Sequence, residues 1–387
     1  MERISDKLLS WASVLEPATR EQALRTSEMP FVRPHVALMP DAHLGLGATV
    51  GSVIPTVRAI MPAAVGVDIG CGMIAVRSQL IGAGLDRSRL RALRESVERA
   101  VPLSAGRYNR KLTATAQARV DELRALDGAA TADGTARNWP LQLGSLGSGN
   151  HFIEVTLDEG DRVWLFLHSG SRGVGNKIAQ HHIDVARELA RSRGARLPDP
   201  DLAHLEEGTP QFDAYIRDLR WAQHFALLNR EEMMDRLVEC VAEWSGEPVA
   251  EQERINCHHN FTQLEEHYGQ RVWLSRKGAI EARAGQPGLI PGSMGTASYV
   301  VVGKGNEAAL RSSPHGAGRL HSRRAARRTF THAQLREAMR GIEFRDTPAF
   351  LDEIPAAYKD IDQVMADAAD LVDVRHTLRQ VVNVKGD

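Results

Sequence analysis

The chain has 387 residues, of which 43% are hydrophobic and 25% are charged. These proportions are ordinary for a globular protein, and they exclude a disordered chain or a fibrous repeat. The 48 Lys and Arg residues nearly balance the 49 Asp and Glu residues, so the formal net charge is −1. This balance excludes a surface that is basic overall and coats duplex nucleic acid, but it allows a locally basic site.

The cysteine usage favours a reducing compartment. Cys71, Cys240 and Cys257 are too few and too scattered for a disulfide framework. Residues 1–6 contain early acidic residues and no apolar core of a secretory signal, and the uncharged stretches 44–57 and 284–303 are short or broken by Pro and Gly. We therefore expect a cytoplasmic protein without a membrane span.

Hydrophobic spacing predicts helices and short strands that alternate irregularly along the chain. Helices are expected over residues 83–103, 112–127, 176–193 and 213–245. Strands are expected at residues 63–67, 74–76, 152–155, 163–167, 272–274, 299–302 and 381–384. The pattern lacks the even βαβ spacing of a Rossmann sheet. We expect one mixed α/β (α+β) domain over residues 1–387, with a sheet core flanked by helices and an active site in glycine-rich loops at strand ends.

The turn Gly66–Gly72 contains Asp68 and Cys71 among three glycines. Glycine permits tight backbone conformations and close approach of another group. A thiolate is a soft ligand and a carboxylate a hard one, so the pair suits a borderline divalent metal. A buried thiol beside a turn-capping Asp explains the segment equally well.

Three further segments place histidines beside glycines or strand ends. They are residues 146–155 with His151, residues 167–173 with His168, and residues 256–261 with His258 and His259. The adjacent His258 and His259 point in different directions on any regular element, so at most one is expected to join a given metal. A single strand histidine is more often a hydrogen-bonded core residue, and Ser and Gly before a helix are more often a simple cap.

Two later turns and the end of the chain carry other polar groups. Residues 289–298 are rich in small hydroxyl side chains, and residues 313–319 present His315 in a glycine loop beside Arg319. Such a histidine can act as an acid, a base or a nucleophile. Lys385, one of only seven lysines, follows a β-like run near the end, where a solvated tail is the simpler interpretation. Together these loops predict a mononuclear or dinuclear divalent-metal enzyme with a phosphate-bearing substrate.

The motifs resemble, in the same order, those of the RtcB family of RNA-splicing ligases. The resemblance covers residues 29–386 and rests on residues 39–45 (Met-Pro-Asp-Ala-His-Leu-Gly), 66–72, 149–154, 168–173, 257–260, 290–295, 315–319 and 384–386. The Cys-His-His-Asn segment and the compact length are most similar to bacterial members. The resemblance implies an enzyme that uses GTP and two Mn²⁺ ions. It would join an RNA 3′-phosphate or 2′,3′-cyclic phosphate end to a 5′-hydroxyl end through a guanylylated histidine and an RNA-3′-pp-G end, in RNA repair or tRNA splicing.

The resemblance also implies roles for individual residues. Cys71 would bridge two metals, with Asp68 and His151 completing one site and His168 and His259 the other, and His315 would be the nucleophile that takes GMP. The nucleotide would be surrounded by Asn150, His151, Phe152, Glu154, His259, Asn260, Pro291, Gly292, Ser293, Met294, Ser298, His315, Gly316, Ala317, Gly318, Tyr358 and Lys385. The expected partners are the RNA ends and GTP. An activating, archease-like helper protein is possible, and no membrane is expected.

Residues 311–328 contain six Arg and no acidic residue, which gives this stretch +6 and leaves −7 for the remainder. A basic stretch that begins beside His315 is well placed for RNA phosphates, although such a face is usually only solvated. Two other classes remain open. A metal-dependent RNA-end phosphatase or nuclease without GTP explains the metal ligands but gives His315 and Lys385 no role, and a non-catalytic RNA-binding relative would not need the full ligand set.

Overall fold

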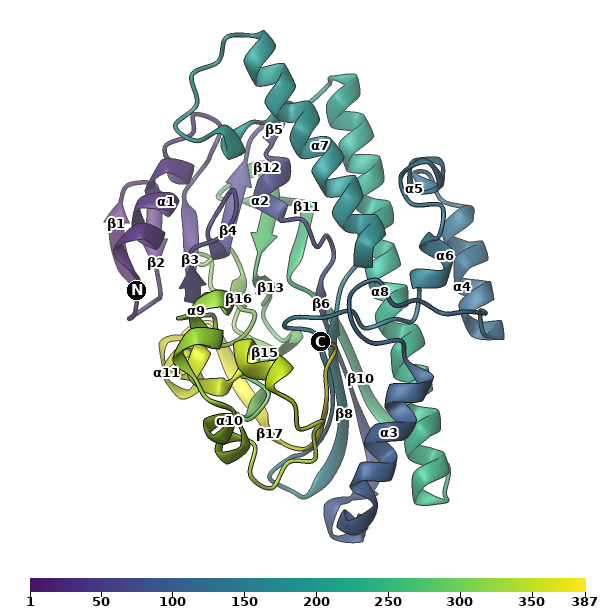
Figure 1. Ribbon diagram of the computed structural model, residues 1–387. Coiled ribbons are helices and arrows are strands. Elements are labelled where there is room, and N and C mark those ends of the chain that lie inside the picture. The colour runs from purple at the N-terminus through teal and green to yellow at the C-terminus, as the bar shows by residue number, and fades with distance from the viewer.

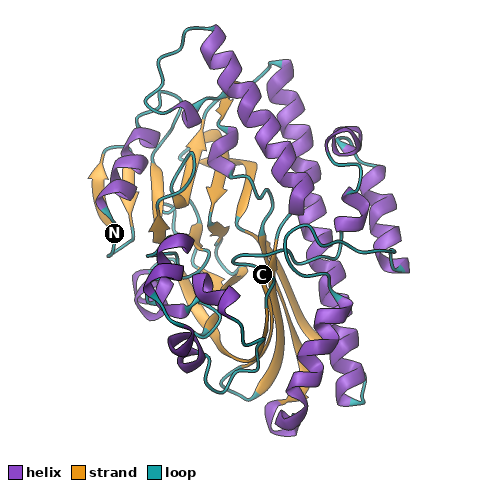
Figure 2. Ribbon diagram, viewed as in Figure 1, coloured by secondary structure: helices purple, strands orange, loops and turns teal.

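The computed structural model describes all 387 residues and contains two large β-sheets, which lie side by side in Figure 2. The six-stranded sheet has the order β1-β2-β3-β4-β12-β11, and the seven-stranded sheet has the order β10-β6-β8-β7-β17-β15-β14. Within these sheets only β2 and β3 pair in parallel. The fold is therefore mixed α/β without repeated parallel βαβ units, as the irregular spacing predicted.

The strands of the six-stranded sheet are β1 (Glu2–Ser5), β2 (Leu8–Ser10), β3 (Val36–His43), β4 (Val50–Thr56), β11 (Asn260–His267) and β12 (Gln270–Lys277). Those of the seven-stranded sheet are β6 (Gly72–Ile81), β7 (Phe152–Leu157), β8 (Arg162–Ser169), β10 (Glu251–His258), β14 (Pro287–Ile290), β15 (Ser298–Gly303) and β17 (Val372–Val384). Two small sheets pair β5 (Ala59–Ile60) with β9 (Leu205–Glu206) and β13 (Ala279–Glu281) with β16 (Ser312–Pro314).

The α-helices are α1 (Pro17–Ser27), α2 (Pro62–Val65), α3 (Leu90–Ala100), α4 (Ala114–Arg124), α5 (Ala129–Thr135), α6 (Trp139–Gln142), α7 (Arg172–Ser192), α8 (Pro210–Ser245), α9 (Arg323–Thr329), α10 (His332–Ala338) and α11 (Ile361–Asp367). Figure 1 shows the long helices α7 and α8 running along one side of the sheets, with α4, α5 and α6 outside them. Short 3₁₀ turns lie at Gly82–Gly84, Arg87–Arg89, Pro200–Leu202, Pro348–Glu353 and Pro355–Ala357. None of the helices combines the length and the hydropathy needed to cross a bilayer.

The four expected helices correspond to α3, α4, α7 and α8, and six of the seven expected strands lie within observed strands. The helix expected from residue 83 begins only at Leu90, because 3₁₀ turns occupy much of the preceding segment. The strand expected at residues 63–67 is wrong: this segment forms α2. Pro62 starts that helix, and its four residues are all buried, so the sequence shows no polar alternation that would distinguish a helix from a strand.

Strand register brings the glycine-rich loops together where strands β6, β7, β8 and β10 of the seven-stranded sheet begin or end. His168, near the end of β8, lies opposite both Met73 of β6 and Phe152 of β7. His258, at the end of β10, lies opposite Gly72 at the start of β6. In antiparallel neighbours the end of one strand meets the start of the next, so segments far apart in sequence meet here.

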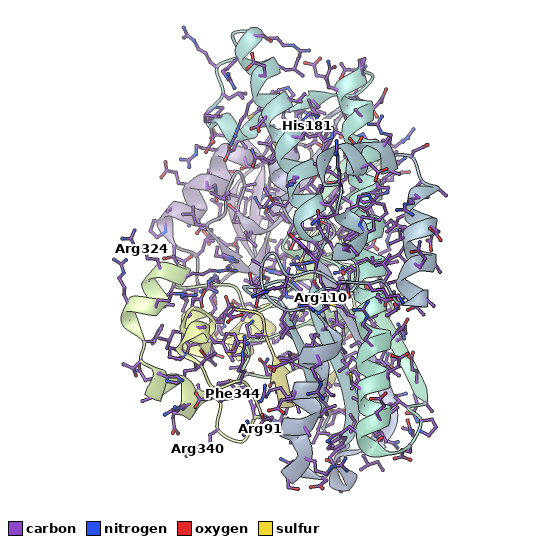
Figure 3. The ribbon with its side chains drawn as sticks, turned by 45° about the vertical axis from the view of Figure 1, so that its right-hand side comes forward. Arg91, Arg110, His181, Arg324, Arg340 and Phe344 are labelled. Carbon is purple, nitrogen blue, oxygen red and sulfur yellow. The ribbon has the colours of Figure 1, made fainter.

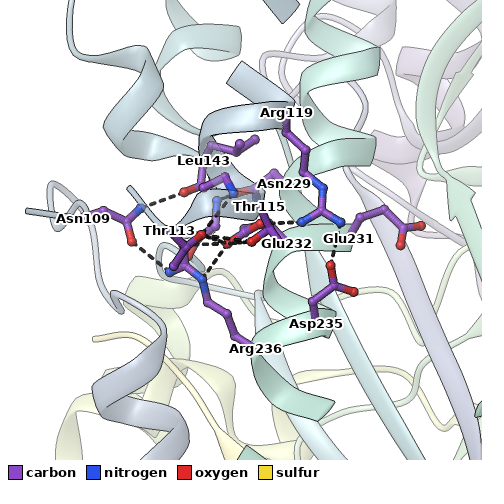
Figure 4. A network of polar contacts seen from close by, with 12 residues as sticks. Asn109, Thr113, Thr115, Arg119, Leu143, Asn229, Glu231, Glu232, Asp235 and Arg236 are labelled. Carbon is purple, nitrogen blue, oxygen red and sulfur yellow. Dashed lines mark hydrogen bonds and ion pairs between the residues drawn. The ribbon is translucent and has the colours of Figure 1, made fainter. Parts of the chain in front are cut away.

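A buried ionic network fastens α4 to α8 (Figure 4). The fully buried Glu232 of α8 pairs with Arg119 of α4 and with Arg236 one turn further along α8. Thr113, which caps the start of α4, also donates to Glu232 at 2.7 Å. Arg236 in turn donates to Asn109 and to two backbone carbonyls. The carboxylate therefore holds together the segments on both sides of α4.

Replacement of Glu232 by Ala is expected to lower the free energy of unfolding by about 3–5 kcal/mol, because it leaves a buried guanidinium without its counter-charge. Burial opposes ionisation of Glu232, but Thr113 and Arg236 keep its pKa below the usual range. Its contribution is therefore present near neutral pH and lost as pH falls through that lowered pKa. Urea unfolding measures the change. Glu243→Ala, an exposed position on the same helix, serves as control and is expected to shift stability by about 0.5 kcal/mol or less.

Candidate active site

Two groups of side chains that could each hold a metal ion share Cys71. One contains Asp68, Cys71 and His151, and the other contains Cys71, His168 and His259, with the ligand atoms of each group all within 4.8 Å of one another. The Cys71 sulfur lies 3.4 Å from His151 Nε2 and 3.2 Å from His168 Nε2. The structure thus brings together all five residues expected to bind metal. His258 lies outside both groups, with its Nδ1 2.8 Å from the Gly70 carbonyl.

The hydrogen bonds of the three histidines fix which nitrogen faces the groups. The Nδ1 atoms of His151 and His168 lie 3.0 and 3.2 Å from the carbonyls of Leu146 and Asn150. The Nδ1 of His259 lies 3.2 Å from the Asn260 side-chain oxygen. For His168 and His259 these partners are oxygen acceptors, so Nδ1 carries the proton and Nε2 presents its lone pair to Cys71 and its neighbours. His151 differs, because its Nδ1 also lies 3.0 Å from the Arg172 guanidinium and its Nε2 lies 3.1 Å from Asp68 Oδ2.

Burial sets the charges of this centre. It lowers the pKa of His168 and His259 well below the usual value, and the neighbouring histidines add to that effect. Burial would raise the pKa of Asp68, but the hydrogen bond and charge of His151 lower it to about 2. Burial and the Asp68 charge raise the pKa of the Cys71 thiol. The protein thus presents a carboxylate, a thiol and neutral imidazoles.

This donor set fits divalent metal ions. The Nε2 atoms of His168 and His259 lie 2.8 Å apart, with no proton between them once both Nδ1 atoms are protonated. Two lone pairs facing one another at this distance repel unless a cation lies between or beside them. Imidazole, carboxylate and thiolate ligands suit borderline metals, and a bound cation would also favour the thiolate form of Cys71.

The backbone around Asp68 leaves no room for other side chains. A Cβ on Gly170 would lie 2.2 Å from Asp68 Oδ1, which also accepts from the Ser171 N–H at 3.0 Å. Gly70 has a φ of +71°, and a Cβ there would meet Gln223 and Ala226 of α8 at 2.8 Å. These contacts explain why glycines flank the predicted ligands: the turn and the loop before α7 pack against each other and against α8.

A buried arginine of α8 holds this turn from behind. Arg230 is fully buried and donates to the carbonyls of Gly70 and Ser169 at 2.8 and 3.2 Å. Burial lowers its pKa to about 10, with the opposite effect of Cys71 next in size. The sequence analysis missed Arg230, since nothing in a 36-residue helical pattern marks one arginine as inward-facing.

His315 lies beside the second metal group and is held by a carboxylate. Its ring centroid is 4.6 Å from that of His259, and its Nδ1 donates to Asp41 Oδ2 at 2.6 Å. The same oxygen accepts from the backbone N–H groups of His315 and Gly316 at 3.1 and 3.2 Å. Asp41 is fully buried, so it fixes the ring and leaves Nε2 as the basic nitrogen. Asp41 belongs to the motif at residues 39–45, but the sequence analysis assigned it no role.

His315 and the metal groups border one cavity of about 420 Å³. Fourteen of the residues expected around a nucleotide line it: Asn150, Phe152, His259, Asn260, Pro291, Gly292, Ser293, Met294, His315, Gly316, Ala317, Gly318, Tyr358 and Lys385. Asp68 and His168 line it as well. A cavity of this size, in which many polar and ionisable side chains converge, is suited to a charged small molecule.

Three residues expected around the nucleotide lie behind the cavity wall. They are His151, Glu154 and Ser298, all buried. Glu154 accepts from Asn383 at 2.7 Å, and burial raises its pKa to about 8. The Ser298 hydroxyl has no hydrogen-bond partner. Phe152 and Lys385 line the cavity, whereas the Glu154 carboxylate bonds to Asn383 and Gln380 of β17.

Lys385 is buried rather than part of a solvated tail. Its Nζ donates to the His151 carbonyl at 3.3 Å and lies 3.5 Å from Glu353 Oε2. Glu353 lines the cavity and also accepts from Tyr358 at 2.5 Å and Arg319 at 3.1 Å. Burial would raise the pKa of Glu353, but Lys385 and Arg319 keep it low, so it is ionised. The sequence analysis did not select Glu353, which lies in a 3₁₀ turn with no recognisable motif.

The structure divides the basic run 311–328. Four of its six arginines pair with carboxylates: Arg311 with Glu307, Arg319 and Arg323 with Glu353, and Arg327 with Asp352. Arg324 and Arg328 have no ion-pair partner, and Arg324 projects at the left margin of Figure 3. The stretch is thus less basic than its sequence indicated, because the opposing acids come from elsewhere in the chain.

A buried thiol and histidine cluster that opens into a cavity with a carboxylate-held histidine defines a metal-dependent enzyme rather than a binding module. Comparison with known proteins identifies its kind. The family model of tRNA-splicing ligase RtcB matches residues 22–386. The chain therefore belongs to the RtcB family and is a ligase, as the ordered motifs predicted.

Individual relatives agree with this assignment. The chain is 46% identical to RNA-splicing ligase RtcB of Escherichia coli K12 over 388 residues, covering 96% of this chain and 95% of that protein. It is 31% identical to RNA-splicing ligase RtcB of Mycobacterium tuberculosis, covering 89% and 94%. It is 30% identical to tRNA-splicing ligase RtcB of Pyrobaculum aerophilum, covering 94% and 89%.

Titration with Co²⁺ is expected to give a sulfur-to-metal charge-transfer band that disappears in Cys71→Ser, because only a coordinated thiolate produces such a band. Cys257→Ser is the matched control and keeps the band, since Cys257 belongs to neither ligand group. Absorbance spectra and the metal content after dialysis measure the result. An unchanged band in Cys71→Ser would remove the thiolate from the metal centre.

Proposed function

We propose that this ligase joins an RNA 3′-phosphate or 2′,3′-cyclic phosphate end to a 5′-hydroxyl end, using GTP and two Mn²⁺ ions. The observation that carries the proposal is His315: Asp41 holds its Nδ1, and the ring borders the cavity that the two metal groups also border. The relatives named above are RNA-splicing or tRNA-splicing ligases, which supports RNA as the substrate.

The first step transfers GMP to His315. The Nε2 lone pair attacks the α-phosphorus of GTP, a nitrogen–phosphorus bond forms, and the bond to the β-phosphate oxygen breaks with release of pyrophosphate. Asp41 keeps the Nδ1 proton in place and stabilises the positive charge that the ring acquires. Bound Mn²⁺ would offset the negative charge of the phosphates. The 291–294 turn and the glycines after His315 offer N–H and hydroxyl donors to phosphate oxygens.

Lys385 and its neighbouring carboxylates account for a preference for guanine. An ammonium group can donate to the guanine O6, and a carboxylate can accept from N1 and N2. Two acids act on Lys385: Glu353 on the cavity wall and Glu154 behind it. Adenine offers an amino group where guanine has the carbonyl, so it would place a donor against the lysine ammonium group. Tyr358, whose ring borders the same space, is suited to stack near the base.

The remaining steps take place on RNA. A cyclic phosphate, if present, is first opened to a 3′-phosphate by water. An oxygen of that phosphate attacks the GMP phosphorus and displaces His315, which gives an RNA-3′-pp-G end. The 5′-hydroxyl of the second RNA then attacks the 3′-phosphorus and expels GMP. Each transfer breaks one bond to phosphorus as another forms, and His315 ends as the neutral imidazole with which it began.

The centre also fits a reducing compartment, because a Cys71 thiolate that held metal would have to stay reduced. We therefore place the protein in the cytoplasm. An RNA-end phosphatase would use the same metal ligands, but it would leave the Asp41–His315 pair and the buried Lys385 without a function. An archease-like helper protein is compatible with the proposal.

Incubation with labelled GTP and Mn²⁺ is expected to give an acid-labile GMP adduct on the wild-type protein and none on His315→Ala. Asp41→Asn should form the adduct about 10²-fold more slowly and with an altered pH profile, because Asn holds the ring without compensating its charge. His332→Ala is the control and should react normally, because His332 lies on α10 at the surface, where it pairs with Asp346. An adduct that persists in His315→Ala contradicts the proposed nucleophile.

Lys385→Met is expected to weaken selection of GTP over ATP by about tenfold or more, since it removes a buried donor to the base. Binding of Co²⁺ should be unaffected, because Lys385 belongs to neither metal group. Lys304→Met, at a surface lysine paired with Asp373, is the matched control. Adduct formation at matched GTP and ATP concentrations measures the selectivity, and equal selectivity in wild type and Lys385→Met would remove Lys385 from the nucleotide site.

A further inference from the structure

The connection between α3 and α4 carries an exposed basic and aromatic cluster that the reaction above does not use. Arg107, Arg110 and Lys111 are exposed, and Tyr108 between them is 38% exposed. No acidic residue occurs from 99 to 120. None of the three cations takes part in an ion pair, whereas Arg119 beyond them pairs with Glu232. We call residues 104–113 the 104–113 loop.

The loop is fastened to the body of the protein at two points. The Ser104 N–H donates to the Gly147 carbonyl at 2.8 Å. The Asn109 side chain, seen in Figure 4, donates to the carbonyls of Leu141 and Leu143 at 2.8 and 2.7 Å and accepts from Arg236 at 2.8 Å. Since Asn109 is tied inward, its neighbours on both sides project outward from a fixed backbone. Because the loop backbone is already fixed, binding of a ligand to the cluster would cost little backbone conformational entropy.

The bond between Ser104 and Gly147 places the loop beside the candidate active site. Gly147, which accepts from Ser104, packs so closely on Arg172 that a Cβ there would lie 1.5 Å from the guanidinium. Gly149 approaches the Arg323 guanidinium in the same way. Both arginines lie at the site: Arg172 is 3.0 Å from the ligand His151, and Arg323 lines the cavity. Ser104 also bonds to Asp387, two residues beyond Lys385.

The views agree with this position. Figure 1 shows the C-terminus at the centre of the molecule, next to the connection between α3 and α4. In Figure 3, Arg110 lies near the middle of the view, between α3 and the helices above it. The 104–113 loop thus carries unpaired positive charge on the surface near the cavity, whereas most arginines of the 311–328 run are paired with carboxylates.

We propose that the 104–113 loop binds the single-stranded RNA adjoining the end that is sealed, with Arg107, Arg110 and Lys111 on phosphates and Tyr108 stacked on a base. This inference rests on the RNA ligation proposed above. Proteins that hold single strands without sequence preference combine unpaired cations along the backbone path with aromatic side chains on which bases stack. The loop offers both within five residues, on a fixed backbone next to the proposed nucleophile's cavity.

Charge removal tests the phosphate contacts. The triple variant Arg107→Gln, Arg110→Gln, Lys111→Gln is expected to lower the slope of log affinity against log salt by about 2, since each phosphate contact on a single strand contributes about 0.7. Fluorescence anisotropy with short unstructured RNAs that end in a 3′-phosphate or a 5′-hydroxyl measures the slope. The matched control is Arg87→Gln, Arg162→Gln, Arg379→Gln, three exposed cations without ion-pair partners. Arg162 lies at the start of β8, six residues and about 20 Å along the strand from His168, so it is remote from the candidate active site.

Replacement of the aromatic ring tests stacking separately. Tyr108→Ala is expected to weaken RNA binding by about tenfold, whereas Tyr108→Phe keeps the ring and should bind like wild type. All these positions are exposed, so the thermal unfolding midpoint should not change. Equal salt slopes in the wild type and the loop triple variant, or equal affinity in Tyr108→Ala, overturn the inference.

Formation of the His315 adduct separates this inference from the proposed function, because that step needs GTP but no RNA. The loop variants should form the adduct at the wild-type rate and lose only RNA binding and sealing. If the wild-type protein forms no adduct and seals no RNA, the proposed function fails. If it does both and the loop variants seal equally well at low RNA concentration, only the role of the loop fails.

Discussion

The convergence of ligand atoms on Cys71 is the constraint on which the rest of the site depends. One sulfur belongs to both metal groups, so the Gly66–Gly72 turn, the start of β7, the end of β8 and the junction of β10 and β11 must all meet within a few ångströms. Two antiparallel strand registers bring these segments together, and the fully buried Arg230 ties the turn to the end of β8. Because the imidazoles of His168 and His259 are buried, neutral and oriented through Nδ1, their Nε2 atoms could hold a cation.

A few buried carboxylates orient His315 and the cavity residues beside the two candidate metal groups. A single buried carboxylate, Asp41, receives three hydrogen bonds from the segment that begins at His315, so the ring and the following glycine turn are oriented together. On the cavity wall, Glu353 links Arg319, Tyr358 and Lys385 in one ionic group. The C-terminal strand β17 delivers Lys385 to this group, which explains why the last residues of the chain are buried rather than frayed.

Sequence patterns predicted long amphipathic elements and failed where periodicity is absent. Helices α7 and α8 were recognised because their apolar residues recur at helical spacing over many turns. The short helix α2 was mistaken for a strand because all of its side chains are buried. The candidate metal ligands were found through glycine-flanked motifs and family resemblance, whereas Glu353 and Arg230 lie in segments without a motif and enter the site only through long-range contacts.

The distribution of charge also separates what the sequence determines from what the tertiary structure determines. The sequence determined the family, the mixed α/β class and the identity of the ligand types, because these depend on residue order and local spacing. It could not determine which charges are neutralised, since ion pairs join residues far apart in the chain. The run 311–328, basic in sequence, is largely paired with Glu307, Asp352 and Glu353, whereas the short run Arg107–Lys111 stays unpaired. Only the tertiary structure decided where free positive charge lies, because it alone sets which carboxylates come within reach of each arginine.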